Sequence, residues 1–141
     1  MNSKHTTNLT NTPLDVRFKL SALWVALMFI YIYVDHFDLY TTGDLENIIA
    51  GKMGPFAITQ SSLLQAMLLM MIPSLMIFLC IVLKPKPNRW TNIAVAILYI
   101  AVCVANIIGE TWYFYIFATA IEIILLALIV RYAWTWPRTV Q

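Results

Sequence analysis

Four apolar segments divide the chain, and their number and length constrain its fold more than any other feature. They cover residues 20–34, 61–83, 91–108 and 112–136. A helix needs about 20 predominantly apolar residues to cross a bilayer. The first segment is shorter, but Lys19 can extend toward the headgroups at one end, and Phe37 and Tyr40 can lengthen the helix at the other. The sequence therefore predicts an all-α integral membrane protein that crosses the bilayer four times.

The small number of charged residues argues against a water-soluble fold. Only 11% of the residues are charged and 61% are hydrophobic, whereas soluble domains carry roughly 25% charged residues. The net charge is +2, with the basic residues scattered at the ends of the apolar segments. This distribution suits lipid headgroups better than a nucleic-acid backbone, so we expect membrane lipids and no nucleic acid as partners.

We predict one antiparallel four-helix domain over residues 18–137. Its helices are expected at about 18–36, 56–83, 91–108 and 112–136. Residues 1–17 are polar and have no apolar period, which predicts a disordered or surface-lying tail on the cytoplasmic side. Residues 138–141 form a short tail after the last helix, on the same side.

The connections between the segments carry their own signals. Pro85 and Pro87 predict a non-helical connection over residues 83–90, and the tight turn at 109–111 makes the last two helices antiparallel neighbours. The long connection 35–55 contains a helix-start pattern followed by a short apolar face. It predicts a short helix that lies in the outer membrane interface, between the first and second spanning helices.

Pro73 lies near the middle of the second apolar segment. Proline removes one backbone hydrogen bond and clashes with the preceding turn, so we predict a kink near residues 70–73. A neighbouring helix is expected to satisfy the carbonyl group that the proline leaves free.

Charge indicates which side of the membrane each connection occupies. Eight of the nine basic residues fall on one side: Lys4, Arg17, Lys19, Lys84, Lys86, Arg89, Arg131 and Arg138. Lys52 falls on the other side, with five acids: Asp35, Asp38, Asp44, Glu46 and Glu110. Because Lys and Arg are retained in cytoplasmic loops, both termini are expected in the cytoplasm.

Glu122 is the acid that falls inside an apolar segment. It lies about 15 Å from the start of the fourth helix, near the bilayer centre. An ionised carboxylate there is costly unless it is paired. We expect Glu122 to face the bundle interior as a neutral group that donates a hydrogen bond to Tyr99 or Ser74, and to serve either as a functional group or as a polar link between helices.

Further polar residues recur at helical spacing and should share the faces that point inward. The stripes are Tyr115, Thr119 and Glu122; Tyr99, Cys103, Asn106 and Glu110; and Tyr31, Asp35 and Asp38, with Gln65 on the second helix. They predict a bundle that is polar in its outer half and dry in its inner half, with a pocket open to the outside and Glu122 at its floor. From these stripes we select Glu122, Thr119, Tyr115, Tyr99, Asn106, Glu110, Asp35, Asp38 and Gln65 as candidate ligand-binding residues.

No motif predicts a cofactor, a metal site or an assignable catalytic residue. Cys80 and Cys103 belong to no CxxC pair and lie at depths about 13 Å apart, too far for a disulfide. They are interpreted as small core residues. The methionines of the second segment are interpreted as adaptable packing or as lining for an apolar ligand.

Four stretches resemble a family of short bacterial four-span membrane proteins known as a domain of unknown function. They are GKMGP at 51–55, IPSLMIF at 72–78, KPKPNRW at 84–90 and GETW at 109–112. The resemblance covers roughly residues 18–137 and implies a bacterial cytoplasmic (inner) membrane and a four-helix fold, with no known activity. The overall architecture is also similar to that of DoxX-like membrane proteins, an analogy of fold that transfers no function.

Three functions are compatible with these features. The favoured one is a multi-pass protein whose outward-facing polar cavity binds or transports a small cation, a proton or an amphipathic ligand. The second is a membrane enzyme that uses acid–base chemistry on a lipid-like substrate. The third is a non-catalytic assembly protein whose polar residues link helices. A homodimer is plausible under all three.

Overall fold

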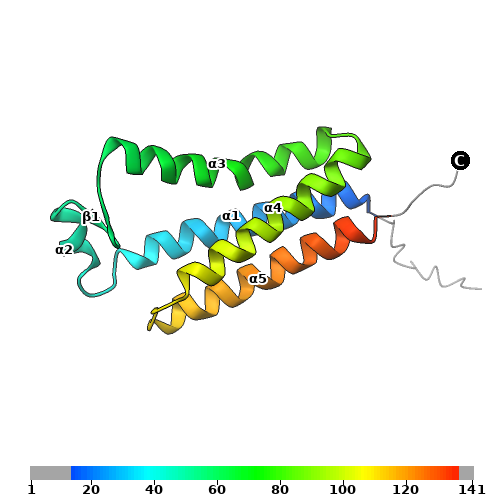
Figure 1. Cartoon of the computed structure of the whole chain (residues 1–141). Coiled ribbons are helices and arrows are strands. Elements are labelled where there is room, and N and C mark those ends of the chain that lie inside the picture. Colours follow the sequence, from blue (N-terminus) through cyan, green and yellow to red (C-terminus); the bar gives the residue numbers. More distant parts are fainter. Residues whose placement is uncertain (1–13, 137–141) are drawn as a thin grey trace, which may run out of the picture.

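Four long apolar helices lie side by side in the computed structural model, which describes residues 14–136 (Figure 1). They are α1 (Val16–Asp38), α3 (Gln60–Val82), α4 (Pro85–Asn106) and α5 (Tyr113–Trp134). Each is long and apolar enough to cross a membrane. The predicted all-α fold with four packed membrane-crossing helices is therefore confirmed. Of the predicted tails, residues 1–13 and 138–141 lie outside the described residues.

The connection between α1 and α3 contains the predicted short helix, α2 (Asp44–Ile49), and also a small hairpin that was not predicted. Its strands β1 (Lys52–Met53) and β2 (Phe56–Ala57) pair in antiparallel register. The predicted second helix began at residue 56, whereas α3 begins at Gln60. A capping box sets this start, because the side chains of Thr59 and Ser62 each accept a hydrogen bond from the other residue's backbone N–H.

The prediction of a non-helical connection over residues 83–90 is wrong. The structure starts α4 at Pro85, immediately after the N-cap residue Lys84. Proline breaks a helix by lacking a backbone N–H, but the first turn of a helix has no internal acceptor for those N–H groups. Pro85 and Pro87 both lie in that first turn, so they are tolerated there and residues 85–90 become helical.

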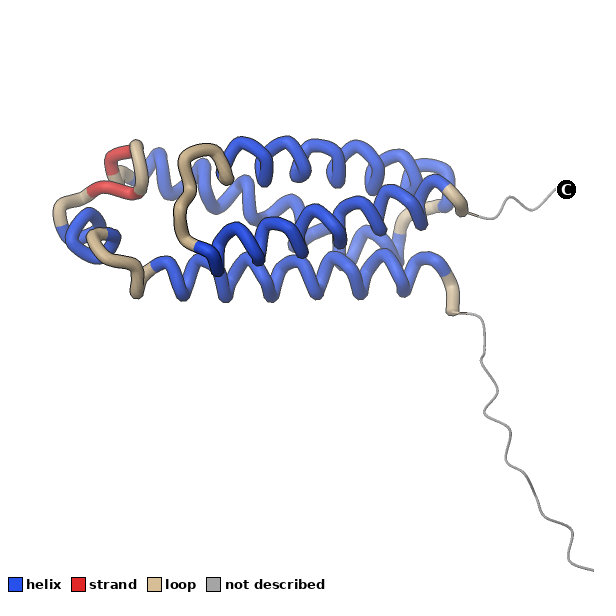
Figure 2. Tube along the Cα trace, turned by 90° about the horizontal axis from the view of Figure 1, so that it is seen from below, coloured by secondary structure: helices blue, strands red, loops and turns tan. Residues whose placement is uncertain are grey.

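The helices pack side by side as an up-and-down bundle in the order α3, α1, α5 and α4. α1 packs against both α3 and α5, and α5 packs along α4, whereas α3 and α4 meet much less. The start of α1 and the end of α5 lie at one end of the bundle, which we call the terminal end (Figure 1). α2, β1 and β2 lie at the other, which we call the hairpin end (Figure 2).

The half of the bundle next to the terminal end has a filled interior. Leu20, Trp24 and Leu27 of α1 have no exposed surface, and Leu126 and Ile129 of α5 are equally buried. In contrast, large apolar side chains such as Phe29, Phe78 and Phe117 are exposed on the outer surfaces of the helices. Such exposed apolar side chains are expected where the surrounding solvent is lipid rather than water.

A buried polar network lies inside this same half and corrects the prediction of a dry inner half. Asn92 Oδ1 accepts hydrogen bonds from Trp24 Nε1 at 2.7 Å and from Cys80 Sγ at 3.2 Å. Asn92 Nδ2 donates to the Asn88 Oδ1 atom at 2.7 Å, and Asn88 Nδ2 donates to the Cys80 carbonyl at 2.6 Å. The network joins α1, α3 and α4. The network was not predicted from the sequence, because residue 88 was assigned to a loop. In the structure Asn88 belongs to α4, and its side chain faces the bundle interior.

Candidate functional site

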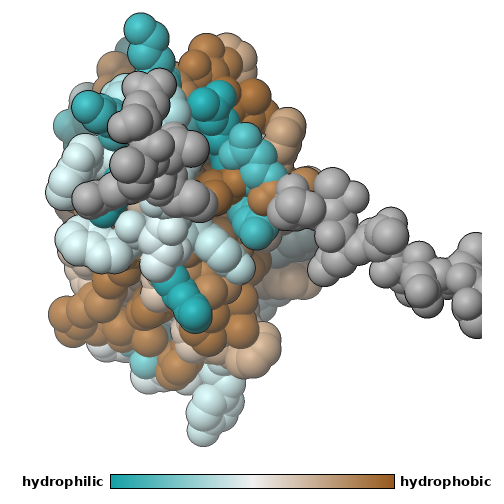
Figure 3. Space-filling model, turned by 90° about the vertical axis from the view of Figure 1, so that its right-hand side faces the viewer, coloured by the Kyte–Doolittle hydropathy of each residue, from teal (hydrophilic) through white to brown (hydrophobic). Residues whose placement is uncertain are grey.

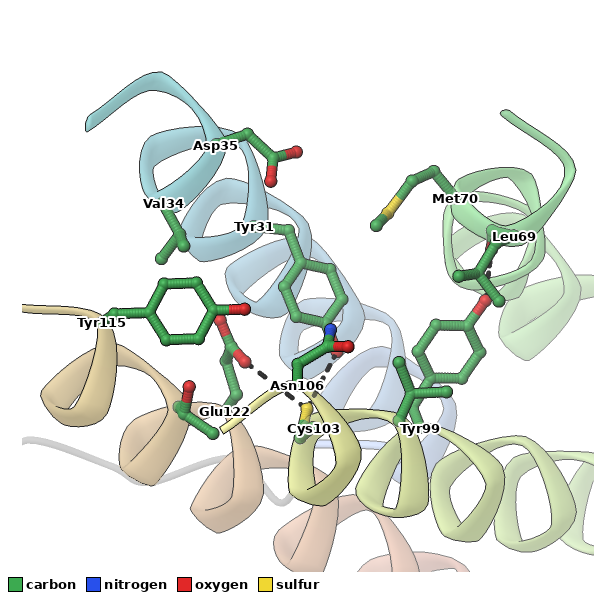
Figure 4. Close-up of a pocket in the computed structure, with 12 residues that line it drawn as sticks. Tyr31, Val34, Asp35, Leu69, Met70, Tyr99, Cys103, Asn106, Tyr115 and Glu122 are labelled. Atoms are coloured by element: carbon green, nitrogen blue, oxygen red, sulfur yellow. Dashed lines mark hydrogen bonds between the residues drawn. The ribbon is translucent and has the colours of Figure 1, made fainter. Parts of the chain in front are cut away.

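Two adjoining cavities open into the hairpin half of the bundle. The smaller one, here called the crevice, has a volume of about 70 Å³ and lies between α1, α3, α4 and α5 (Figure 4). The larger one, here called the vestibule, has a volume of about 810 Å³ and lies between the helix ends and the α2–hairpin connection. Asp35 and Met70 line both cavities, so the crevice and the vestibule adjoin.

Glu122 lies at the closed end of the crevice, where its side chain is only 5% exposed. Cys103 Sγ lies 3.4 Å from Glu122 Oε2 and is the one hydrogen-bond partner that the described residues give this carboxyl group. Cys103 Sγ is also 3.6 Å from the Tyr31 hydroxyl group. The predicted inward orientation of Glu122 is therefore confirmed, and its partner is Cys103, which was placed on an inward polar stripe but not among the candidate ligand-binding residues.

The predicted hydrogen bonds from Glu122 to Tyr99 or Ser74 are absent among the described residues. Ser74 Oγ instead donates to the carbonyl group of Met70, one turn earlier on its own helix, at 2.8 Å. The Tyr99 hydroxyl group donates to the carbonyl group of Leu69 on α3. Both side chains therefore donate to backbone carbonyls of α3, near the middle of the spanning segment. Neither bonds Glu122, whose partner is Cys103.

The Tyr99–Leu69 hydrogen bond follows from Pro73. A residue at position 73 would normally donate its N–H to the carbonyl of residue 69, but proline has no N–H. The Leu69 carbonyl is thus left without its helical partner, and Tyr99 of α4 supplies a replacement. The prediction that a neighbouring helix satisfies the freed carbonyl is confirmed. This bond also ties α3 to α4, in addition to the hydrogen bonds that Asn88 and Asn92 form with Cys80.

Tyr99 separates the crevice from the buried network below it. Its side chain is 1% exposed, and its ring meets the Trp24 ring edge-on, with the centroids 6.5 Å apart. Trp24 in turn donates to Asn92. The crevice therefore ends at Tyr99, and the filled half of the bundle closes it toward the terminal end.

The other predicted site residues divide between the cavities. Tyr115, Thr119 and Asn106 line the crevice with Glu122, Asp38 and Glu110 line the vestibule, and Asp35 lines both. Gln65 is exposed on α3 and lines neither cavity. Gln65 lies on α3 as predicted, but the face of α3 that carries it points away from the other three helices.

The vestibule is lined by two chemically different sets of side chains. One set is the acids Asp35, Asp38, Asp44 and Glu110, and the other is apolar and includes Leu63, Ala66, Met67 and Met70 of α3. Lys52 is the one basic residue among the described residues that line it. Asp44 and Lys52 were not predicted as site residues, because only the folded connection brings them to the helix ends.

Two of the vestibule acids also have local structural partners. Glu110 Oε1 accepts hydrogen bonds from the backbone N–H groups of Thr111 and Trp112 at 2.8 and 2.9 Å. Asp44 accepts a hydrogen bond from the Thr41 hydroxyl group. These bonds fix the turn before α5 and the start of α2. Asp35 and Asp38 have no side-chain hydrogen bond from any described residue, so their carboxylate groups are available to a ligand.

The acids are not arranged for a metal ion. Within residues 14–136, no group of three or more His, Cys, Asp or Glu side chains is placed so that it could hold one. Glu122, at the floor, has a thiol rather than a second carboxylate beside it. The site therefore offers dispersed negative charge and apolar surface rather than a coordination sphere.

Comparison with known proteins identifies a family but no activity. No curated protein and no solved structure matches the chain. A family model described as "Family of unknown function (DUF6326)" matches residues 14–140, which include all four long helices. The resemblance seen in the sequence is thereby confirmed. The chain belongs to the DUF6326 family and is a multi-pass membrane protein.

Proposed function

We propose that this protein binds a small amphipathic cation, such as an organic amine with an apolar tail, through the vestibule and the crevice. The observation that carries the proposal is the mixed acidic and apolar lining of two adjoining cavities. Carboxyl groups from α1, α2 and the turn before α5 line the vestibule together with apolar side chains of α3. Such a cavity favours a ligand that has a positive group and an apolar part.

The volumes of the two cavities suit different parts of such a ligand. The vestibule, at about 810 Å³, falls within the range of roughly 300–1,000 Å³ that is usual for small-molecule sites. The crevice, at about 70 Å³, holds only a few water molecules or one small group. We expect the cationic group to enter the crevice toward Glu122, while the apolar part stays against Met67 and Met70.

The closed end of the crevice supports binding rather than free passage across the membrane. Tyr99 ends the crevice, and beyond it Trp24, Leu27 and Leu126 are fully buried in the filled half. A cation would have to pass both the aromatic side chains and the Asn88–Asn92 network to reach the terminal end. The conformation described here therefore presents a site that is accessible from the hairpin end alone.

We further propose that the hairpin end faces the outside of a bacterial cytoplasmic membrane, with both chain termini in the cytoplasm. Among the described residues, Arg17, Lys19, Lys84, Lys86, Arg89 and Arg131 lie toward the terminal end, and Lys52 lies toward the hairpin end. Retention of basic residues on the cytoplasmic side supports this orientation. Ligands would then enter from outside the cell.

The experiment measures binding of octyltrimethylammonium to the full chain in uncharged detergent, by isothermal titration. Octanol and octyl sulfate are the matched neutral and anionic probes. We expect the cation alone to bind, and Glu122→Gln to weaken its binding at least about tenfold, because a buried charge interaction is lost. Glu46→Gln is the control, since Glu46 is an exposed acid of α2 that lines neither cavity.

Two results would contradict the proposal. One is equal binding of the three octyl probes, which would make the cavity a general apolar site. The other is equal affinity of Glu122→Gln and Glu46→Gln for the cation, which would show that Glu122 does not contact the ligand.

A further inference from the structure

We propose that the terminal end carries a binding site for the phosphodiester headgroup of an anionic phospholipid, centred on Arg89 and framed by Trp90 and Trp134. This site lies at the opposite end of the bundle from the vestibule, and it does not depend on the proposed ligand-binding function.

The Arg89 guanidinium group lies beside two aromatic rings, one from each of two helices. Its Cζ atom lies 5.6 Å from the centroid of the Trp90 ring and 5.3 Å from the centroid of the Trp134 ring. Trp90 belongs to α4 and Trp134 to α5, and their rings meet edge-on with centroids 6.4 Å apart. Cation–π contacts of this kind fix the plane of a guanidinium group, which a flexible surface arginine does not achieve alone.

The guanidinium group of Arg89 has no hydrogen-bond acceptor within the described chain. Its Nε atom is buried and has no hydrogen-bond partner among residues 14–136. A buried polar group without a partner is costly, so such a group in a native structure calls for an additional acceptor nearby. An acceptor at the outward-facing nitrogens of the same delocalised group would offset part of this cost.

The surroundings do not neutralise this charge. Six described basic residues lie toward the terminal end, against the single acid Asp15. The Asp15 carboxylate already accepts a hydrogen bond from the Arg17 backbone N–H at 2.9 Å, as the cap of α1. The compensating negative charge must therefore come from outside the described chain.

The position of the site, at the ends of two spanning helices, favours a lipid over a dissolved anion. Trp90 and Trp134 are 60% and 59% exposed and lie at the ends of spanning helices, where tryptophan marks the headgroup layer. Figure 3 views this end of the molecule and shows hydrophilic residues directly beside apolar surface. Lys19 makes a second cation–aromatic contact, with the Tyr132 ring, at 5.6 Å. A phospholipid matches the polar and the apolar surface at Arg89, with its phosphate on the guanidinium group and its acyl chains along the helices.

Arginine is the residue suited to such a headgroup. Its planar fork donates two parallel hydrogen bonds to phosphate oxygens, which the compact ammonium group of lysine cannot do. The proposal therefore predicts that a change of residue with no change of charge will weaken binding. A nonspecific basic surface predicts that only the total charge matters.

The test titrates phosphatidylglycerol into the full-length protein in uncharged detergent micelles and follows the midpoint of thermal unfolding. Phosphatidylcholine and inorganic phosphate are the comparison arms. We expect phosphatidylglycerol alone to raise the midpoint, and both Arg89→Lys and Arg89→Gln to increase its apparent dissociation constant about tenfold or more. Lys86→Gln removes one charge three residues away and is the matched control, for which we expect less than a threefold change.

The possible outcomes separate the alternatives. An equal effect of inorganic phosphate would assign the site to a free anion and overturn the lipid proposal. Equal losses in Arg89→Gln and Lys86→Gln, with an unchanged Arg89→Lys, would reduce the site to general surface charge and also overturn it. If Arg89→Gln does not fold, Arg89→Lys decides, because it keeps the charge and most of the side-chain volume.

Discussion

The two halves of the bundle use their polar side chains in opposite ways. In the half next to the terminal end, Asn88 and Asn92 form hydrogen bonds with one another and with Trp24 and Cys80, and they line neither the crevice nor the vestibule. In the hairpin half, Asp35, Asn106 and Tyr115 line open space. Polar residues satisfied by the chain itself stabilise the fold, whereas polar residues left facing a cavity are available to a ligand.

The same helices contribute to both halves. α4 carries Asn92 in the filled half and Asn106 in the hollow half, 14 positions apart on one helix. Asn92 has no exposed surface, whereas Asn106 is exposed and lines the crevice. The difference arises from the neighbours, because α3 approaches α4 near the 83–84 connection and diverges from it toward the hairpin end (Figure 1). Packing therefore decides which asparagine is structural.

The sharpest expected difference between the two ends is their accessibility. We expect a cysteine introduced at Thr42, which is exposed at the hairpin end, to react with an impermeant maleimide on intact cells. Cysteines at Asn2 and Gln141 should react only after permeabilisation. Reaction of either terminal cysteine on intact cells would invert the orientation proposed from the charges.

A large loss of stability is expected from the filled half. Asn92→Leu leaves the buried Trp24 indole N–H and the Asn88 Oδ1 atom without their partner, at a cost of about 2–4 kcal/mol in the free energy of unfolding. Unfolding in mixed detergent–SDS micelles measures it. The matched control is Asn106→Leu on the same helix, which removes no hydrogen bond made by described residues and should cost less than about 0.5 kcal/mol. Similar losses for the two variants would erase the distinction between the halves.

The architecture could be predicted from the sequence, and the polar interior only in part. Apolar segment length and the short connections determine four antiparallel helices, because a bilayer admits few alternatives. The spacing of Tyr115, Thr119 and Glu122 correctly placed them on the inward face. The identity of the Glu122 partner could not be predicted, since Cys103 and Tyr99 lie one turn apart and the relative shift of two helices decides between them.

The error in the predicted start of α4 also hid the buried polar network. Proline was interpreted as a helix breaker, although in the first turn it is a helix starter. That error placed Asn88 in a loop and concealed the network that fills the terminal half. In the same way, the vestibule residue Lys52 comes from a hairpin whose two-residue strands are too short to give a sequence pattern.

A double-mutant cycle can isolate the bond at the boundary between the halves. Tyr99→Phe removes the hydroxyl group that satisfies the Leu69 carbonyl, and we expect it to cost about 1–2 kcal/mol in the free energy of unfolding. In a Pro73→Ala background, the new N–H at position 73 can bond that carbonyl within α3. Tyr99→Phe should then cost less, by about 1 kcal/mol. Equal costs in both backgrounds would show that Tyr99 does not replace the missing helical bond.

The smallest expected change in stability is at Glu122, and it decides whether this residue belongs with the hollow half. Its one hydrogen bond within the described chain is the 3.4 Å contact with the Cys103 thiol, a weak donor. Glu122→Gln preserves the shape and still offers an acceptor oxygen to that thiol. We therefore expect it to cost less than about 0.5 kcal/mol in the absence of ligand, while weakening binding of the octyltrimethylammonium probe.

Glu122→Gln should thus resemble Asn106→Leu in stability and differ from Asn92→Leu. The measurement is the same unfolding titration, with and without the cationic probe. A loss as large as that of Asn92→Leu, with binding unchanged, would make Glu122 a link between α4 and α5. The acids of the vestibule would then lack the deep anchor that the cation-binding proposal assigns to them, since Glu122 is the acid that lines the crevice below Asp35.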